Sequence, residues 1–419
     1  MNLSHELLKF HSPGNRYVYF PMTKSWNGQS YTPLNSLDIK DNNIHLYLHL
    51  PFCRQVCTFC GCNINLSSKA KDHLLYVRAL KKEWEIRNVT QLLKQSHKSI
   101  SLSLGGGTPN DLHPEALQEL REFLNQEIPK NLSFGLIEAN PNSLSHEHVL
   151  FAKSISCNAF SFGVQDFSTE VCKNVNRHQN ISTLERTFSE LPDQFLKGID
   201  LIWGLPKQNI EHIPSLWKDS IKKLRPDWIS FYPLAEVPWM KTYQDAYGDF
   251  SLPDLSQKYL FFEQGCKMLE ESGYTHLFFG HFIRQDSTLN KQDLYHTVSG
   301  LLPQKPEILI GLGVGAITLT PHQYQQNEKV LETYKNKVLN NSKLPILRNH
   351  RLEKKEMVFN EYRDEIIQNR RLPSLYADII QKEFPKSWFN ELAITNKGVF
   401  FLKNILQFVQ KQHFNNLYQ

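Results

Sequence analysis

The sequence lacks the features of a membrane-spanning, secreted or nucleic-acid-binding protein. Its longest nearly unbroken apolar run, residues 308–319, is too short and too rich in glycine to cross a bilayer. Residues 1–17 contain no apolar core and no small-residue cleavage site, so we expect no secretory signal and a cytoplasmic location. The net charge of +5 is mild and spread along the chain, which fits an anionic substrate better than nucleic acid. We therefore expect neither nucleic acid nor a membrane as a partner.

Cysteine is scarce outside one short segment. Four of the seven cysteines lie within residues 53–62, and no second pair of closely spaced cysteines follows. An odd total with one dense cluster argues against a secreted disulfide scaffold, and the missing second pair disfavours a structural zinc site. We expect the three scattered residues, Cys157, Cys172 and Cys266, to be small buried apolar side chains.

Strand-like and helix-like segments alternate through the first half of the chain. We predict strands at 44–50, 99–104, 132–138, 159–164, 195–203 and 228–232. The intervening helices are predicted at 69–94, 113–127, 146–157, 169–191 with a break near 177–180, and 213–224. Six such repeats imply parallel strands joined by right-handed crossovers. This pattern favours an α/β fold, an incomplete (β/α)6 barrel, over a flat doubly wound sheet.

The remaining segments suggest four regions. Residues 1–40, with several prolines and glycines, are expected to form an N-terminal arm. Residues 41–290 would be the partial barrel and its extension, which adds a helix at 254–272 and a strand at 275–279. Residues 291–345 would be a connecting region that holds a buried strand and its exit at 308–319. Residues 346–419, rich in Lys, Glu and long aliphatic side chains, would be a small, mainly helical C-terminal domain.

The cysteine cluster follows the first predicted strand directly. Cys53, Cys57 and Cys60 can wrap one face of a 4Fe–4S cluster, which needs four ligands. Three thiolates leave one iron open, and that iron can chelate the amino and carboxylate groups of S-adenosylmethionine (SAM). An electron from the cluster then breaks a carbon–sulfur bond and releases a 5′-deoxyadenosyl radical. Cys62 could be a fourth ligand, a redox-active thiol or part of a substrate pocket, and Gly61 beside it disfavours ligation.

The second predicted strand runs into Gly105-Gly-Gly-Thr-Pro109. Glycines at the end of a strand let the backbone approach a ligand without an intervening Cβ. That ligand would be the amino group of the methionyl part of SAM. A plain turn is the alternative when the motif is considered alone, and its position beside the cysteine loop favours the binding role.

With both motifs present, the chain resembles the oxygen-independent coproporphyrinogen III oxidase family of the radical SAM superfamily. The resemblance runs over nearly the whole chain, and its short motifs occur in the order of the family. These are SPGNRYVYFP (12–21), YLHLPFCRQVCTFCGCN (47–63), LGGGTP (104–109), IEANP (137–141), FGVQDF (162–167), NVNRHQ (174–179), GIDLIWGLP (198–206), LGVGAIT (312–318) and LAITNKGVFFLKNIL (392–406).

The resemblance implies a role for particular side chains. Cys53, Cys57 and Cys60 would ligate the cluster, and Tyr47 would be the catalytic residue near the sulfonium. The family binds two SAM molecules, and its cofactor contacts map to Gly106, Gly107, Thr108, Glu138, Gln165, Arg177, Asp200, Ala235 and Ile317, with Ile317 on the side of the second molecule. Structural ion pairs remain the alternative for Glu138, Arg177 and Asp200, and Tyr47 and His49 could be satisfied core groups.

The activity implied by the resemblance is that of a radical SAM oxidoreductase in heme biosynthesis. The adenosyl radical would remove a hydrogen atom from the β-carbon of a porphyrinogen propionate, and loss of one electron and CO2 would leave a vinyl group. A tetracarboxylate substrate needs cationic contacts, for which Arg16 and Arg284 are candidates. A reducing partner such as flavodoxin or ferredoxin and a monomeric state are also expected.

Two departures from the family pattern keep other functions open. The family typically has Asp-His-Phe-Ala where this chain has Gly280-His-Phe-Ile283, and Phe-Gln where it has Val298-Ser299. In the family the first position lies at the substrate end and the second lies beside the second SAM molecule, so neither change is at the cysteine loop. They favour, as the alternative, a radical SAM methyltransferase or another tetrapyrrole-modifying enzyme. A heme-binding chaperone is a third hypothesis, and Cys62 and the N-terminal arm argue against it.

Overall fold

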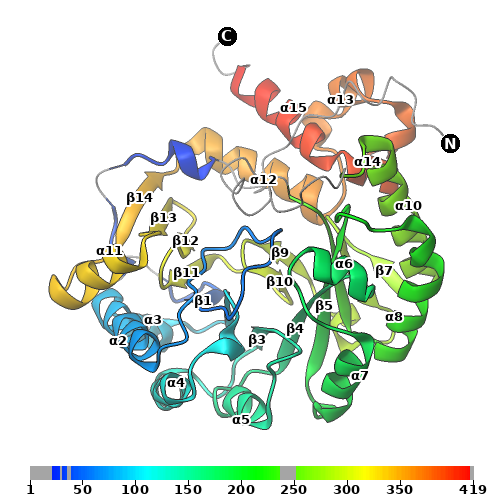
Figure 1. Cartoon of the computed structure of the whole chain (residues 1–419). Helices are drawn as coiled ribbons and strands as arrows, with labels where there is room; N and C mark the ends of the chain where they lie inside the picture. Colours follow the sequence, from blue (N-terminus) through cyan, green and yellow to red (C-terminus); the bar gives the residue numbers. More distant parts are fainter. Residues whose placement is uncertain (1–20, 29–30, 35–38, 236–251, 416–419) are drawn as a thin grey trace.

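The computed structural model describes residues 21–28, 31–34, 39–235 and 252–415 (Figure 1). Its centre is a mixed sheet of twelve strands in the order β14-β13-β12-β11-β1-β2-β3-β4-β5-β6-β8-β7. The strands are β1 (Ile44–Leu50), β2 (Ile100–Gly106), β3 (Phe134–Ala139), β4 (Ala159–Gln165), β5 (Leu196–Trp203), β6 (Trp228–Pro233), β7 (Tyr274–His276), β8 (His281–Arg284), β11 (Ile308–Leu312), β12 (Ile317–Leu319), β13 (Gln323–Asn327) and β14 (Ile346–Arg351).

The six predicted βα repeats are confirmed. Strands β1 to β6 pair in parallel in chain order, and helices lie around the outside of the curved sheet (Figure 1). Because β14 and β7 end the sheet without pairing with each other, the described residues form an open, incomplete barrel. The helices are α2 (Ala70–Arg87), α3 (Val89–Gln95), α4 (Pro114–Glu127), α5 (His146–Ser154), α6 (Thr169–Asn174), α7 (Ile181–Glu190), α8 (Lys218–Leu224) and α10 (Leu255–Glu271).

Local sequence explains where these helices begin. Pro114 occupies the first turn of α4, where its missing N–H costs nothing. Asn180 caps α7 by accepting a hydrogen bond from the Thr183 N–H at 2.9 Å. The cap separates α7 from α6 and produces the break that the sequence predicted near 177–180. The strands of the parallel sheet are buried along most of their length, as β2 illustrates, because helices cover its outer face.

Three predicted elements differ from the structure. The helix predicted over 69–94 is divided into α2 and α3 by Asn88, whose φ of 56° interrupts the helical hydrogen bonds. The strand predicted over 275–279 ends at His276 as β7, and the chain turns back at Gly280 into β8, which pairs antiparallel with β7 and β6. The buried strand predicted at 308–319 is two strands, of which β11 adds a seventh parallel strand beside β1.

The C-terminal region is mainly helical, as expected. It contains α12 (Lys354–Gln368), α13 (Ala377–Glu383), α14 (Asn396–Phe400), α15 (Leu402–Asn415) and a two-stranded sheet of β15 (Phe389–Asn390) and β16 (Ala393–Ile394). Because β14 belongs to the central sheet, that sheet extends past the expected start of this domain at residue 346. The division into four regions stays a prediction, and most of the arm at 1–40 lies outside the described residues.

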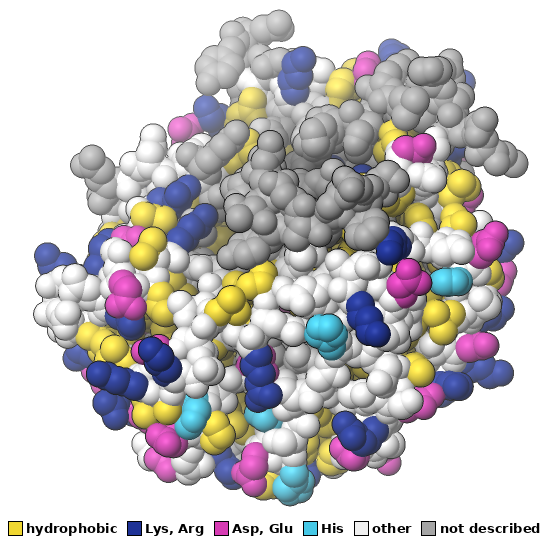
Figure 2. All heavy atoms as spheres, in the orientation of Figure 1, with side chains coloured by type: hydrophobic (Ala, Val, Ile, Leu, Met, Phe, Trp, Pro, Cys, Tyr) yellow, Lys and Arg dark blue, Asp and Glu magenta, His cyan; other side chains and the backbone are white. Residues whose placement is uncertain are grey.

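The described surface has mixed charge. On the face shown in Figure 2, basic and acidic side chains are interspersed among white and yellow areas. No helix in the described part of the chain is long and apolar enough to cross a membrane.

Candidate cluster and cofactor site

The cysteine loop follows β1 and is closed by hydrogen bonds at its base. The Cys53 N–H donates to Asn65 O at 3.2 Å, and the Asn65 N–H donates to Pro51 O at 2.7 Å. Inside the loop, the Cys60 N–H donates to Cys57 O at 3.0 Å. These bonds make a compact loop at the carboxyl end of β1, where α/β barrels build their active sites.

The three predicted ligands are half-buried free thiols, and Cys62 is exposed. Burial raises the pKa of Cys53 to about 11, so this thiol ionises readily only beside positive charge. A hydrogen bond from the Cys62 thiol is the main cause that lowers the pKa of Cys60. Half-buried thiols gathered in one short loop fit the ligands of a metal cluster, which deprotonates its cysteines. No three or more His, Cys, Asp or Glu side chains of the described ranges are gathered closely enough to hold a single ion.

The other three cysteines are buried, as predicted. Burial raises the pKa of Cys172 to about 12 and moves the pKa values of Cys157 and Cys266 upward as well. These thiols are therefore inert packing groups.

The GGGTP motif lies directly against the cysteine loop. The Gly107 N–H donates to Leu50 O at 2.9 Å, and the Thr108 N–H donates to Phe52 O at 2.9 Å. A Cβ on Gly107 would lie 2.6 Å from the Pro51 carbonyl oxygen, so only glycine allows this approach. Thr108 Oγ1 lies 3.4 Å from the sulfur of Cys53. The motif thus supports the cluster loop, which goes beyond a plain turn.

Two carboxyl groups with raised pKa values lie inside this edge of the barrel. Burial raises the pKa of Glu138 to about 8, helped by the negative charges of Cys62 and Asp200 and opposed by the Gly106 N–H at 3.3 Å. Burial also raises the pKa of Asp200 to about 6, although hydroxyl groups of Ser230 and Ser161 and the charge of Arg177 oppose this. Hydroxyls rather than a contacting cation satisfy Asp200, which favours a ligand site over a structural ion pair.

Arg177 joins the end of β4 to the cysteine loop. Its Nη2 donates to Gly163 O, its Nε donates to Gln179 Oε1 at 2.9 Å, and its Nη1 lies 3.8 Å from the sulfur of Cys57. Gln165 is buried nearby, at a β-bulge where its φ is 72°. The structure therefore brings both predicted SAM contacts close to the cluster loop.

Tyr47 and His49 lie near the end of β1, and a hydrogen bond of His49 connects this strand to the segment after the cysteines. Tyr47 Oη lies 3.2 Å from His49 Nδ1, and His49 Nε2 lies 2.8 Å from Asn63 O. Burial lowers the pKa of His49, so its ring is neutral and links the strand to the loop. The catalytic assignment of Tyr47 stays a prediction.

The two remaining predicted contacts lie at the edges of this arrangement. Ala235 follows β6 and is the last residue described before 252. Ile317 begins β12, close to Gly311 of β11, and its side chain packs against the cluster of Trp26, Tyr324 and Leu352. Both assignments stay predictions.

A chain of polar rings at the end of β6 was missed by the sequence reasoning. Tyr232 Oη lies 2.8 Å from His281 Nε2, which lies 3.0 Å from His296 Nδ1. Burial lowers the pKa of His296 to about 4, and that of His281 falls well below its usual range. In the sequence, only the position of His281 in the Gly-His-Phe-Ile segment could have indicated this chain of rings. His296 lies on β9 (Tyr295–Thr297), in a separate hairpin, so no local pattern connects it to His281.

The proposal of Arg284 as a substrate contact is wrong. Its guanidinium pairs with Asp227 at 3.0 Å and with Asp286 at 2.5 Å. Asp227 precedes β6, so Arg284 lies at the edge opposite the cysteine loop. Arg16, the other candidate, lies outside the described residues.

Gly280 and Ser299, which depart from the family pattern, both make close contacts with neighbouring residues. Gly280 has a φ of 123°, and a Cβ there would lie 2.5 Å from Phe231 O. An aspartate therefore does not fit this backbone. Ser299 is buried in the turn between β9 (Tyr295–Thr297) and β10 (Gly300–Leu302), with its Oγ 2.9 Å from Thr297 Oγ1.

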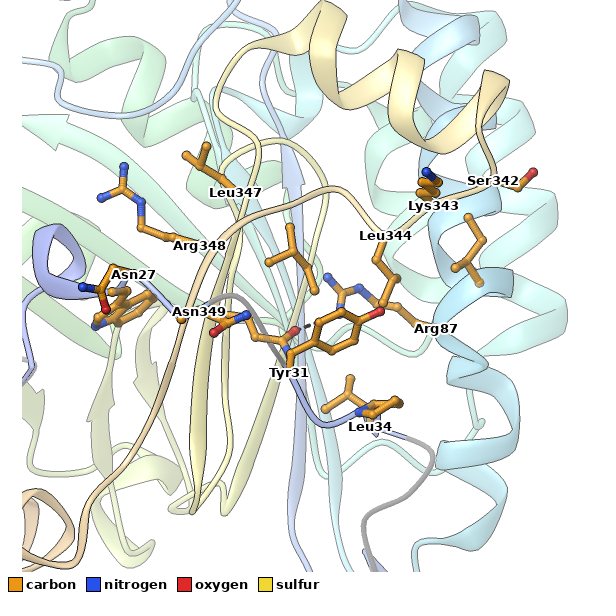
Figure 3. Close-up of a pocket in the computed structure, with 16 residues that line it drawn as sticks. Asn27, Tyr31, Leu34, Arg87, Ser342, Lys343, Leu344, Leu347, Arg348 and Asn349 are labelled. Carbon is orange, nitrogen blue, oxygen red and sulfur yellow. Dashed lines mark hydrogen bonds between the residues drawn. The ribbon is translucent and has the colours of Figure 1, made fainter.

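A cavity of about 770 Å³ lies elsewhere in the molecule. Figure 3 shows Tyr31 and Leu34 of the N-terminal segment, Arg87 of α2 and Asn349 of β14 around it. Its lining includes none of the predicted cluster or SAM residues, so the cavity is separate from the site described above.

Comparison with known proteins agrees with this geometry. Residues 47–219 match the Radical SAM superfamily. The oxygen-independent coproporphyrinogen III oxidase of Helicobacter pylori (strain 26695) is 30% identical over 356 residues, covering 81% of this chain and 77% of that protein. The protein of the same name from Synechocystis is 29% identical over 363 residues, covering 83% of this chain and 76% of that protein.

A solved structure extends the similarity to the whole fold. Coproporphyrinogen III oxidase from Escherichia coli, described as a radical SAM enzyme, superposes with a TM-score of 0.83 at 26% identity. The superposition covers 96% of this chain and 97% of that one. The chain belongs to the oxygen-independent coproporphyrinogen III oxidase family of the radical SAM superfamily.

Proposed function

We propose that this chain is a radical SAM oxidoreductase that converts propionate groups of coproporphyrinogen III to vinyl groups without oxygen. Family membership over most of the chain supports the reaction class. The observation that carries the proposal is the direct contact of the cysteine loop with both the GGGTP motif and Arg177. The GGGTP motif in turn contacts Glu138, whose carboxyl group accepts a hydrogen bond from the Gly106 N–H at 3.3 Å.

The three cysteines of the loop would hold the group that supplies the radical. Cys53, Cys57 and Cys60 would hold a 4Fe–4S cluster whose fourth iron is open. When bound, the cluster and SAM supply the 5′-deoxyadenosyl radical that removes a hydrogen atom from a propionate β-carbon. Loss of CO2 from the substrate radical would then leave the vinyl group, with the remaining electron passing to a separate one-electron acceptor.

The carboxyl groups would bind and orient SAM. With a pKa of about 8, Glu138 is largely protonated at neutral pH and can donate a hydrogen bond to a SAM hydroxyl or carboxylate oxygen. Asp200, with a pKa of about 6, is largely ionised and accepts hydrogen bonds. Gly106, Gly107 and Thr108 would bring backbone to the methionyl part. A second SAM molecule would bind on the side of Ile317.

The remaining parts of the proposal concern partners. A low-potential donor such as flavodoxin or ferredoxin would reduce the cluster. We propose a cytoplasmic monomer, which suits an oxygen-sensitive cluster and reduced free thiols.

Product mass tests the function. The anaerobically reconstituted protein is given reductant, SAM and coproporphyrinogen III, and tetrapyrrole mass and 5′-deoxyadenosine are followed together. Loss of two CO2 per tetrapyrrole with matching 5′-deoxyadenosine is expected. Cys60→Ala should abolish both, whereas Cys157→Ala, which changes a buried packing thiol, should retain both. Full-length protein that carries a cluster and cleaves SAM yet leaves coproporphyrinogen unchanged would refute the substrate.

Gly280 favours a second candidate, a tetrapyrrole methyltransferase. An aspartate cannot occupy this position without moving the Phe231 carbonyl, so the family's acid is lost from the substrate side. The same assay separates the candidates. A gain of one methyl group supports the methyltransferase, and retention of heme without SAM cleavage supports a heme chaperone.

A further inference from the structure

The turn between α6 and α7, residues 175–179, is bonded to the cysteine loop and is called the clasp below. The Thr58 N–H donates to Val175 O at 3.1 Å, and Gln55 Nε2 donates to Asn176 O at 3.1 Å. Asn176 Nδ2 returns a bond to Val56 O at 2.7 Å. Three bonds thus fix the clasp to the residues on both sides of Cys57.

The clasp is in turn fixed to the barrel. The Arg177 N–H donates to Cys172 O at 2.8 Å, and the buried Gln179 side chain donates to Val164 O at the end of β4. Asn176 adopts a φ of 54°, which turns the chain back toward the loop. The position of Arg177 relative to Cys57 is therefore set by hydrogen bonds of the clasp to both the cysteine loop and the barrel.

The guanidinium group of Arg177 is held in one orientation. Gly163 O and Gln179 Oε1 accept from two of its nitrogens, which directs Nη1 to the sulfur of Cys57 at 3.8 Å. A Cβ on residue 163 would come within 3.1 Å of Nη2, so Gly163 leaves the space that the group needs. The Arg177 cation is therefore held beside the Cys57 sulfur by its other hydrogen bonds, unlike the charge of an exposed side chain.

We propose that Arg177 donates a hydrogen bond to the Cys57 thiolate and raises the reduction potential of the cluster. This rests on the proposed function only in that Cys57 ligates a cluster. The reduced cluster carries one more negative charge than the oxidised cluster, so a fixed cationic donor stabilises the reduced form more. Hydrogen bonds to cluster sulfurs and nearby charge are known controls of such potentials. The clasp is then a device that makes the cluster easier to reduce before SAM is cleaved.

Arg54 provides a matched control on the same loop. It lies one residue after the Cys53 ligand, but its side chain is 70% exposed and pairs with Asp111 at 3.2 Å. Arg54→Gln and Arg177→Gln remove the same charge, and only the second removes a contact with a ligand sulfur. Arg177→Lys keeps the charge and loses the planar fork.

The test is an anaerobic potentiometric titration of the reconstituted full chain, followed by electron paramagnetic resonance without SAM or substrate. At the midpoint potential of the wild type, the Arg177→Gln protein should contain at least ten oxidised clusters for each reduced one. This ratio corresponds to a midpoint potential that is lower by at least 59 mV for a one-electron couple. Arg177→Lys should shift less, and Arg54→Gln should stay within twofold of wild type. An Arg177→Gln midpoint equal to wild type, or an equal shift in Arg54→Gln, would overturn the proposal.

The iron content of each variant shows whether a cluster has assembled before its reduction potential is compared with wild type. If Arg177→Gln fails to assemble a cluster, Arg177→Met, which keeps the aliphatic stem, is titrated in its place. Failure of both neutral variants to bind iron, with normal assembly in Arg177→Lys, would show an assembly role and refute tuning. Because neither SAM nor tetrapyrrole is present, the potential can shift as expected even if the product assay rejects coproporphyrinogen.

Discussion

Glu138→Gln should stabilise the cofactor-free protein at high pH. Burial raises the pKa of Glu138 from 4.5 to about 8, so the folded state binds this proton more tightly than the unfolded state does. As pH rises from about 4.5 to about 8, the unfolded chain ionises first and wild-type stability falls. Glutamine cannot ionise, so its contribution does not change over this range.

The pKa shift sets the size of the effect. At 1.36 kcal/mol per pKa unit, a rise of this size corresponds to about 5 kcal/mol. The side chain is only partly buried, and water that reaches it screens part of the cost. We therefore expect Glu138→Gln to be about 2 kcal/mol more stable than wild type near pH 8.5, with no difference below about pH 4.5.

The assay is urea unfolding of the cofactor-free protein at several pH values, with Glu122→Gln at an exposed site of α4 as control. The stability difference between Glu138→Gln and wild type should grow as pH rises, and the control should show no such trend. A difference that is independent of pH, or a variant less stable than wild type near pH 8.5, would refute the electrostatic reasoning.

Two further substitutions test the supports of the site. Gly107→Ala puts a methyl group 2.6 Å from the Pro51 carbonyl, so it should cost about 1–3 kcal/mol and lower the iron bound per chain. Gly273→Ala meets no neighbouring atom but strains a backbone with a φ of 85° far from the cysteine loop, so it should leave iron content unchanged. Full iron in Gly107→Ala would contradict this. Glu83→Ala leaves the buried Arg87 without its partner at 2.8 Å and should lower the free energy of unfolding by about 3–5 kcal/mol in urea. A loss below about 1 kcal/mol would show that the pair is dispensable.

The parallel half of the barrel was predictable because its signals are local. Each of β1 to β6 is a short apolar segment followed by an amphipathic helix, and both turn chemistry and periodicity lie within a few residues. The cysteine spacing and the GGGTP motif were likewise readable, since each lies at the end of a predicted strand. The buried state of Cys157, Cys172 and Cys266 followed from their scattered positions.

The missed features depend on contacts between distant segments. Strand β11 joins β1 through the pairing of Ile44 with Ile308, and no local pattern reveals a partner so far away. The break at Asn88 needs a left-handed residue that helical periodicity does not detect. The chain from Tyr232 to His296 combines β6, β8 and the β9–β10 hairpin, so it appears only when the fold is assembled.

The distribution of agreement and departure along the fold has a physical meaning. The family-like residues that contact the cluster loop lie on β1, directly after β2 and in the clasp, and the clasp is in turn bonded to β4. The departures lie on β8 and the β9–β10 hairpin, where Gly280 fits against Phe231 O and Ser299 is bonded to Thr297. Replacing Gly280 alone by the family's aspartate would force backbone movement rather than restore an acid. The segments around Gly280 and Ser299 therefore differ from the family pattern together with their packing, while the residues expected to cleave SAM are retained.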